Sequence, residues 1–202
     1  MTRGEQHPPR PWPGNAHKKT DLGYCPYISQ KGNGGFAFLH KKKYISDEVS
    51  MERLKIYLDN CCYNRPYDDQ SQLKVSLEAQ AKLEIQQQIR NGVFDLVTSY
   101  ILVAENAANR FESKRNDIQN FIDTYTHTYV SENVDEQVKS LAKEIMATGV
   151  KLMDACHVAS SIISGCDYFL TTDKRLLKYQ TDKVKILNPM TFILEVEENY
   201  EH

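Results

Sequence analysis

The chain has 202 residues, of which 41% are hydrophobic and 26% charged, and its formal net charge is −2. This balance is typical of a globular protein with one domain or slightly more. No apolar stretch reaches the roughly 18 residues that a membrane-spanning helix requires. The first residues, Met-Thr-Arg-Gly-Glu-Gln-His-Pro-Pro, lack the apolar core of a secretory signal. We therefore expect neither a membrane span nor a membrane partner.

The cysteines exclude two further classes of protein. There are five, and none forms a C-x-x-C pair. Cys61 and Cys62 are adjacent, whereas Cys156 and Cys166 lie in apolar segments. This distribution fits neither a disulfide framework nor a zinc site. Free thiols suit a reducing compartment, so we expect a cytoplasmic protein.

Residues 1–50 differ in composition from the rest of the chain. They hold five of the seven prolines, all within the first 26 residues, and six of the nine glycines. Their eight Lys and Arg against four Asp and Glu give a charge of +4, which leaves residues 51–202 with 17 against 23, a charge of −6. Such a segment buries too little apolar surface to order itself, so we expect a flexible basic extension. The alternatives are a tail that binds nucleic acid or a partner protein, and a start codon assigned upstream of a natural start at Met51.

From residue 51 onward, short apolar strands alternate with amphipathic helices. Strands are predicted at residues 55–58, 94–97, 128–130, 167–171 and 184–187. Helices are predicted at residues 73–90, after Ser99, at 116–124, 134–148 and 152–164, and at the C-terminus, with a turn-rich stretch after the first strand. Strands separated by helices indicate βαβ units and a parallel sheet. We therefore expect one α/β domain over residues 51–202.

Four acidic residues occupy positions that suggest a functional site in such a fold. Asp59 directly follows the first strand and Asp173 follows the fourth, and ligands of parallel sheets bind beyond the carboxyl ends of strands. Glu105 and Asp154 interrupt otherwise apolar helices, where an unpaired charge is costly. A divalent cation such as Mg²⁺ or Mn²⁺ would offset that cost. Taken singly, each residue is equally well explained as a helix cap or part of a solvated face.

The four positions together resemble the PIN domain family of nucleases, which includes the VapC-type toxin ribonucleases. An apolar strand ends in Asp-Asn at Ile56–Asn60, and a Ser precedes apolar residues and a Glu at Ser99–Glu105. Asp-Ala-x-His-x-Ala stands at Asp154–Ala159, and Gly-x-Asp precedes an apolar strand and Thr-x-Asp at Gly165–Asp173. The acids are 46, 49 and 19 residues apart in the order Asp, Glu, Asp, Asp. The resemblance covers Leu54 to about Val196.

The resemblance implies a PIN-like three-layer sandwich, in which a central five-stranded parallel sheet is flanked by helices. It implies a metal-dependent endoribonuclease that uses Mg²⁺ or Mn²⁺ to hydrolyse phosphodiester bonds of an RNA substrate. The same four carboxylates are then both catalytic residues and metal ligands: Asp59, Glu105, Asp154 and Asp173. A small antitoxin protein and a homodimer are further partners that this family suggests. The N-terminal extension and the Cys61-Cys62 stretch depart from the family pattern.

Other polar residues are secondary candidates. Asn60, Ser99 and Thr171 are candidates for orienting the metal ligands, although Ser99 is explained equally by capping its helix. His157 lies one helical turn after Asp154, where it would contact phosphate, orient a carboxylate, or simply pack in the core. Basic residues near the acids are candidates for contacting substrate phosphates, or else lie at solvated helix ends. The basic candidates are Arg65, Lys174 and Arg175, together with Arg110, Lys114 and Arg115.

Two other functional classes remain as alternatives. A haloacid-dehalogenase-like phosphatase also begins with a strand and an Asp, but it needs a second Asp two residues later, where this chain has Cys61. A non-catalytic PIN-like protein that binds nucleic acid or acts as a scaffold is the remaining alternative. Because all four acidic positions are filled, we expect the enzyme rather than the scaffold.

Overall fold

The structure is a computed structural model that describes residues 53–200. The expected extension at residues 1–50 lies outside the described residues. The elements are, in chain order, β1 (Lys55–Leu58), α1 (Asn60–Asn64), the 3₁₀ helix η1 (Arg65–Tyr67), α2 (Leu73–Arg90), β2 (Asp95–Ser99), α3 (Tyr100–Ala107), α4 (Glu112–Tyr125), β3 (Thr126–Val130), η2 (Glu132–Val134), α5 (Asp135–Met146), α6 (Leu152–Ile163), β4 (Tyr168–Leu170), η3 (Leu176–Lys178), β5 (Lys185–Leu187) and α7 (Pro189–Tyr200).

The five strands form one sheet in the order β3-β2-β1-β4-β5, and all neighbouring strands are parallel. The first strand lies at the centre, where Ile56 is in register with Leu96 of β2 and with Tyr168 of β4. The chain builds outward on one side through β2 and β3, and then returns to the other side through β4 and β5. The chain that leaves β1 and the chain that leaves β4 therefore run to opposite sides of the sheet. The carboxyl ends of these two strands lie at the middle of one edge, where parallel sheets hold their ligands.

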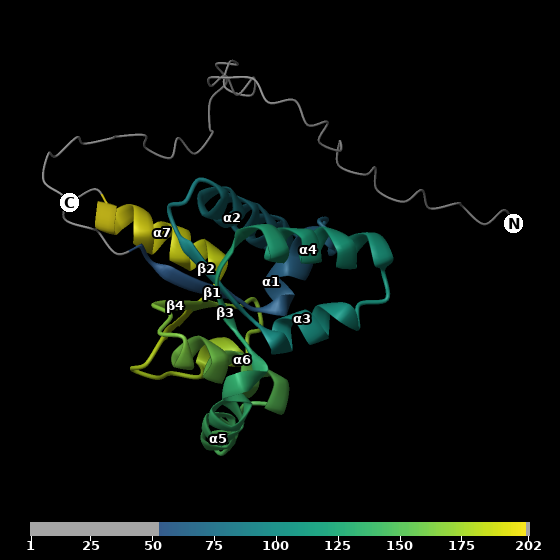
Figure 1. The fold of residues 1–202 in the computed structure, drawn as a ribbon. Coiled ribbons are helices and arrows are strands. Elements are labelled where there is room, and N and C mark those ends of the chain that lie inside the picture. The colour runs from purple at the N-terminus through teal and green to yellow at the C-terminus, as the bar shows by residue number, and fades with distance from the viewer. Residues whose placement is uncertain (1–52, 201–202) are drawn as a thin grey trace, which may run out of the picture. The chain divides into compact units, whose positions relative to one another are not determined.

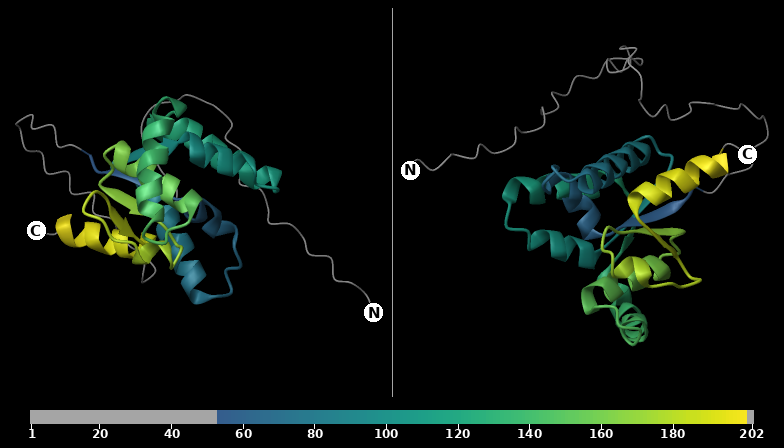
Figure 2. Two further views of the ribbon diagram at one scale, coloured as in Figure 1. Left: turned by 90° about the horizontal axis from the view of Figure 1, so that it is seen from below. Right: turned by 180° about the vertical axis from the view of Figure 1, so that it is seen from behind.

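Helices cover both faces of the sheet, as parallel strands require because each crossover must pass over a face. Figure 1 shows α2 and α7 on one side of the sheet and α5 and α6 on the other. Figure 2 shows the α3–α4 pair and α7 at opposite ends of the sheet. The core lies along the central strands, where Ile56, Leu96 and Phe169 are fully buried. The fold is thus an α/β sandwich with an all-parallel sheet.

The predicted strands are all present, with ends that differ by at most two residues from the expected ones. The turn-rich stretch after β1 is instead helical, since α1 and η1 occupy most of it. Cys62 and Tyr63 of α1 are fully buried, so packing holds a helix that is too short to show a periodic pattern. Among residues 53–200, no helix is long and apolar enough to span a membrane.

Candidate active site at the carboxyl edge of the sheet

Asp59 is the centre of the candidate site because it ends the central strand and lies beside the end of β4. Its backbone N–H donates to the carbonyl of Leu170 at 2.9 Å, which continues the pairing of the two strands by one residue. Its side chain is only 5% exposed. Asp59 directly follows the buried residues Ile56, Tyr57 and Leu58 of β1, and the fold places its charge at the middle of the edge.

Two side chains hold the Asp59 carboxylate in place. The hydroxyl of Thr171 donates to Oδ2 of Asp59 at 2.7 Å, and the thiol of Cys61 donates to the same oxygen at 3.0 Å. The Thr171 hydroxyl also accepts the N–H of Asp173 at 3.1 Å, which links the first and fourth acidic positions. Thr171 therefore orients a site carboxylate. Cys61, at which the sequence departs from the family pattern, has the same contact.

Asp154 and Asp173 lie close enough to Asp59 for their charges to interact. Burial raises the pKa of the Asp154 carboxyl above its ordinary value, and the negative charges of Asp59 and Asp173 raise that pKa further. His157 and Lys151 offset this only in part. Among the described residues, no Lys or Arg forms an ion pair with Asp59 or Asp154. Within residues 53–200, Asp59 and Asp154 therefore lack an ion-paired cation, and Asp173 has only the exposed Arg175, whose Nε lies at 4.0 Å.

Glu105 is held by a buried row of hydrogen bonds. Its Oε2 lies 2.8 Å from Nε2 of His157, and Nδ1 of that ring lies 2.8 Å from the hydroxyl of Tyr57. The Tyr57 hydroxyl is in turn 2.7 Å from Oγ of Ser99. The hydrogen bond from His157 is the main reason why the pKa of Glu105 is lowered, and a contact from Asn60 lowers it further. This row orients Glu105 and keeps it ionised.

The residues of this row clarify three of the sequence predictions. Ser99 caps α3, since its Oγ accepts the N–H of Leu102 at 3.2 Å, and it also contacts Tyr57. His157 is 1% exposed and orients a carboxylate instead of reaching substrate. Sequence reasoning did not single out Tyr57, although a tyrosine in a central parallel strand signals a buried hydroxyl that needs a partner.

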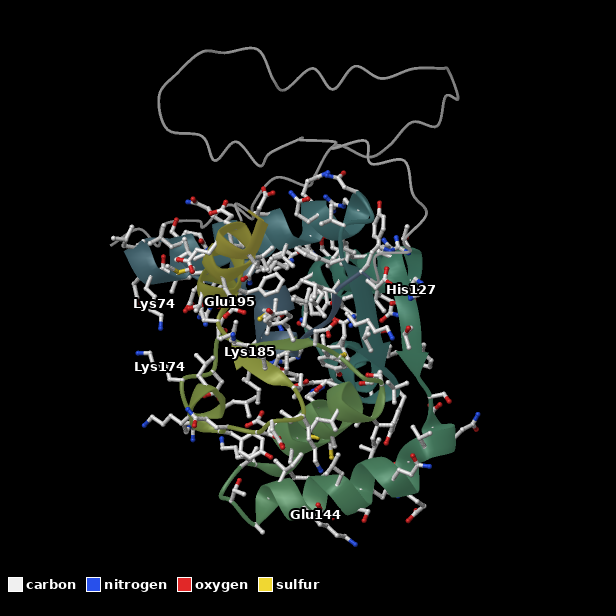
Figure 3. The ribbon with its side chains drawn as sticks, turned by 90° about the vertical axis from the view of Figure 1, so that its left-hand side faces the viewer. Lys74, His127, Glu144, Lys174, Lys185 and Glu195 are labelled. Carbon is white, nitrogen blue, oxygen red and sulfur yellow. The ribbon has the colours of Figure 1, made fainter. Side chains whose placement is uncertain are left out.

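The predicted phosphate-binding residues have different surroundings. Arg65 forms ion pairs with Asp68 at 2.9 Å and with the buried Glu78 at 3.1 Å. Lys174 is exposed, and Figure 3 shows it pointing away from the sheet. Arg175 has a 74% exposed side chain whose Nε lies 4.0 Å from Asp173. The two residues after Asp173 are therefore accessible to a ligand, whereas Arg65 joins structural elements.

Two hollows flank the acidic centre. The first, which we name the Asp154 hollow, has a volume of about 410 Å³ and includes the basic residues Lys151, Arg175 and Lys178. The second, which we name the Phe111 hollow, has a volume of about 360 Å³ and includes Glu105. Asp154 thus lines the first hollow and Glu105 the second.

Carboxylate oxygens are the ligands that a hard divalent cation prefers. As they stand, the described residues contain no group of three His, Cys, Asp or Glu side chains that could hold a metal ion. A bound cation would offset the repulsion from Asp59 and Asp173 that raises the pKa of Asp154.

The cysteines in the described part of the chain are free thiols, at positions 61, 62, 156 and 166. Neither a scan against protein-family models nor a search of curated proteins gives a match for this chain.

Proposed function

We propose that this protein is a metal-dependent endoribonuclease. The observation that carries the proposal is the convergence of Asp59, Asp154 and Asp173 at the edge between β1 and β4, where among the described residues the exposed Arg175 beside Asp173 is the one Lys or Arg that forms an ion pair with them. A carboxyl such as that of Asp154, whose pKa is raised by neighbouring acids, is typical of functional sites. The resemblance of the four acidic motifs to PIN nucleases supports the same conclusion.

Asp59, Glu105, Asp154 and Asp173 are the residues that would hold a Mg²⁺ or Mn²⁺ ion. When bound, such an ion supplies a Lewis acid that neutralises charge on the scissile phosphate and activates water for hydrolysis. The chain's own contribution is orientation. Thr171 and Cys61 fix the Asp59 carboxylate, while the row from Ser99 through Tyr57 and His157 fixes Glu105, which Asn60 also contacts.

The substrate-binding part of the proposal rests on exposed cations. Lys174 and Arg175 follow Asp173 directly, and Lys151 and Lys178 lie with Arg175 around the Asp154 hollow. The domain is acidic overall, so these local cations would offset its repulsion of a polyanion. We extend the proposal to the cytoplasmic role that the resemblance suggests, with a small antitoxin protein covering the acidic edge and a homodimer as the active form.

The test is cleavage of single-stranded and structured RNAs by the full chain with Mg²⁺, with Mn²⁺ and with EDTA. We expect cleavage that needs the metal and that falls by more than about 100-fold in Asp59→Asn, because loss of a ligand costs more than loss of an orienting residue. Glu144→Gln is the matched control, since this exposed carboxylate lies on the outer helix α5 (Figure 3).

Binding of Mn²⁺ provides a readout that does not depend on finding the natural RNA. Calorimetry of the wild type should show binding that Asp59→Asn weakens and Glu144→Gln preserves. A folded wild type that cleaves none of the RNAs and binds no Mn²⁺ would overturn the proposal and favour the non-catalytic scaffold. Cleavage that persists in Asp59→Asn would place the chemistry elsewhere.

A further inference from the structure

The Phe111 hollow has a composition that the metal site does not explain. It adjoins Glu105 and is formed by α1, the end of α3 and the start of α4. Three asparagines, two basic residues and one phenylalanine surround it: Asn60, Asn64, Asn109, Arg110, Phe111 and Lys114. Amides, cations and an aromatic ring around one opening are the groups that bind a nucleotide's base edge, phosphate and base face.

Phe111 is 70% exposed although it is a large apolar side chain. It immediately precedes α4, and its backbone N–H donates to Oδ1 of Asn109 at 3.2 Å. Nη1 of Arg115 donates to the backbone carbonyl of Asn109 at 2.9 Å, which ties the loop to the first turns of α4. A single exposed phenylalanine is common on protein surfaces. Phe111, however, lies on a loop that these hydrogen bonds hold in place, and it lines a polar hollow beside the candidate site.

The asparagines form a connected set that retains unused donors. Nδ2 of Asn109 donates to Oδ1 of Asn64 at 3.3 Å, and Nδ2 of Asn64 donates to both oxygens of Asn60, at 2.9 and 3.1 Å. Asn60 also contacts Glu105. Each amide nitrogen carries two hydrogens, so Asn60 and Asn109 each keep one for a ligand. The set therefore joins the hollow to the metal-site residue Glu105 through hydrogen bonds.

The basic groups lie where a phosphate would enter. Arg110 is exposed, and Lys114 is half-buried with its Nζ 5.2 Å from the centre of the Tyr67 ring. The first turn of α4 carries the acidic Glu112, which offsets the attraction of this helix end for anions. The attraction for the phosphate of a bound nucleotide therefore comes from the two cations.

We infer that the Phe111 hollow binds one unpaired nucleotide of the RNA, next to the phosphodiester bond at the acidic centre. The base stacks on Phe111, the amides of Asn60 and Asn109 donate to its edge, and Arg110 and Lys114 bind its phosphate. A base paired in a duplex has no free face for the ring, so the site selects single-stranded RNA. This inference rests on the proposed function and adds a substrate class to it.

The test measures binding separately from cleavage. Anisotropy of a labelled single-stranded 12-nucleotide RNA and of its duplex is recorded in EDTA, with the full chain. We expect Phe111→Ala to weaken single-strand binding by about tenfold, within the range for one stacked base, and to leave the duplex unaffected. Phe111→Trp should keep the affinity. Leu194→Ala is the control, because this 54% exposed side chain lies on α7, at the opposite end of the sheet (Figure 2).

A fluorescence readout reports stacking directly. The chain has one tryptophan, Trp12, so Trp12→Phe combined with Phe111→Trp leaves a single reporter at the hollow. Single-stranded RNA should quench it, and duplex should not. Unchanged single-strand affinity in Phe111→Ala, alongside metal-dependent cleavage by the wild type, would overturn the subsite and leave the nuclease proposal standing. Neither binding nor cleavage of any RNA by the wild type would overturn both.

Discussion

Two groups of acidic side chains in this molecule are built in opposite ways. Glu78 of α2 is 1% exposed. Its carboxylate forms ion pairs with Nε of Arg65 at 3.1 Å and Nζ of Lys74 at 3.3 Å, and it accepts a hydrogen bond from Nδ2 of Asn188 at 2.8 Å. Asp154 is less buried, yet its charged neighbours include two further acids, Asp59 and Asp173, which raise its pKa. One acid is fully compensated and the other is not.

The two groups of acids have different roles in the fold. The partners of Glu78 come from α2, from η1 and from the residue that precedes α7, so this carboxylate joins three elements of one helical layer. The acids at the sheet edge join few elements and repel one another. Proteins keep such a destabilising arrangement where a ligand needs it, and this is why we propose the uncompensated group as the functional site.

Breaking the compensated group should have the largest effect on stability. Glu78→Ala leaves the Arg65 guanidinium without its buried partner, which typically costs about 3–5 kcal/mol. The free energy of unfolding from urea titration measures this. Glu144→Ala, which removes an exposed carboxylate on α5, is the control, and we expect it to cost less than about 1 kcal/mol. Equal losses in the two variants would contradict the special role of Glu78.

Removing the uncompensated acid Asp154 should reduce activity strongly and leave stability unchanged or higher. We expect Asp154→Asn to reduce metal-dependent cleavage by more than about 100-fold, as for a group that acts directly on the metal. In EDTA at pH 7 the same variant should be as stable as the wild type or more stable, because repulsion from Asp59 and Asp173 is relieved. A clear loss of stability in urea titration would show that Asp154 is instead a structural residue.

A buried lysine on α2, the helix that carries Glu78, extends the comparison to an uncompensated positive charge. Lys82 is 4% exposed, and burial lowers its pKa from 10.5 to about 7. Below pH 7 the amine is protonated in the folded and unfolded states alike, and the folded state bears the full desolvation cost. Above pH 7 only the unfolded state keeps the proton, so the stability of the wild type rises as the pH increases towards 10.5.

Lys82→Met should therefore stabilise the protein most at low pH. At pH 6 we expect a gain of about 2 kcal/mol or more, since each unit of lowered pKa corresponds to about 1.4 kcal/mol. The gain should shrink steadily between pH 7 and pH 10 in paired urea titrations of the two proteins. A gain that is independent of pH would contradict the premise that burial of the charged Lys82 amine destabilises the folded protein.

Two buried tyrosines offer a closely matched pair of variants, for which we expect the smallest effect. The hydroxyl of Tyr57 belongs to the row that ends at Glu105, whereas the hydroxyl of Tyr63 finds no hydrogen-bond partner among residues 53–200. We expect Tyr57→Phe to reduce cleavage by about tenfold, as for other residues that orient a ligand. Tyr63→Phe should leave cleavage unchanged and be neutral or stabilising. The test fails if both variants behave alike.

Much of the fold was predictable because its strands are short apolar runs with helices between them. Asp59 and Asp173 could be found for the same reason, since each charge follows an apolar strand. The short helix α1 could not, because five residues show no periodicity and its burial depends on long-range packing. The row through Tyr57 was also out of reach, since its partners Ser99 and His157 are 42 and 100 residues away.

The row of hydrogen bonds has a direction, and α3 sets it. The ionised Glu105 carboxylate can only accept, so Nε2 of a neutral His157 ring carries the hydrogen and donates to it, and Nδ1 is left to accept. Tyr57 therefore donates to Nδ1, and its oxygen accepts the hydrogen of Ser99. The Ser99 oxygen in turn accepts the amide hydrogen of Leu102. The helix α3 thus holds both ends of the row, since it carries Glu105 and supplies the Leu102 amide.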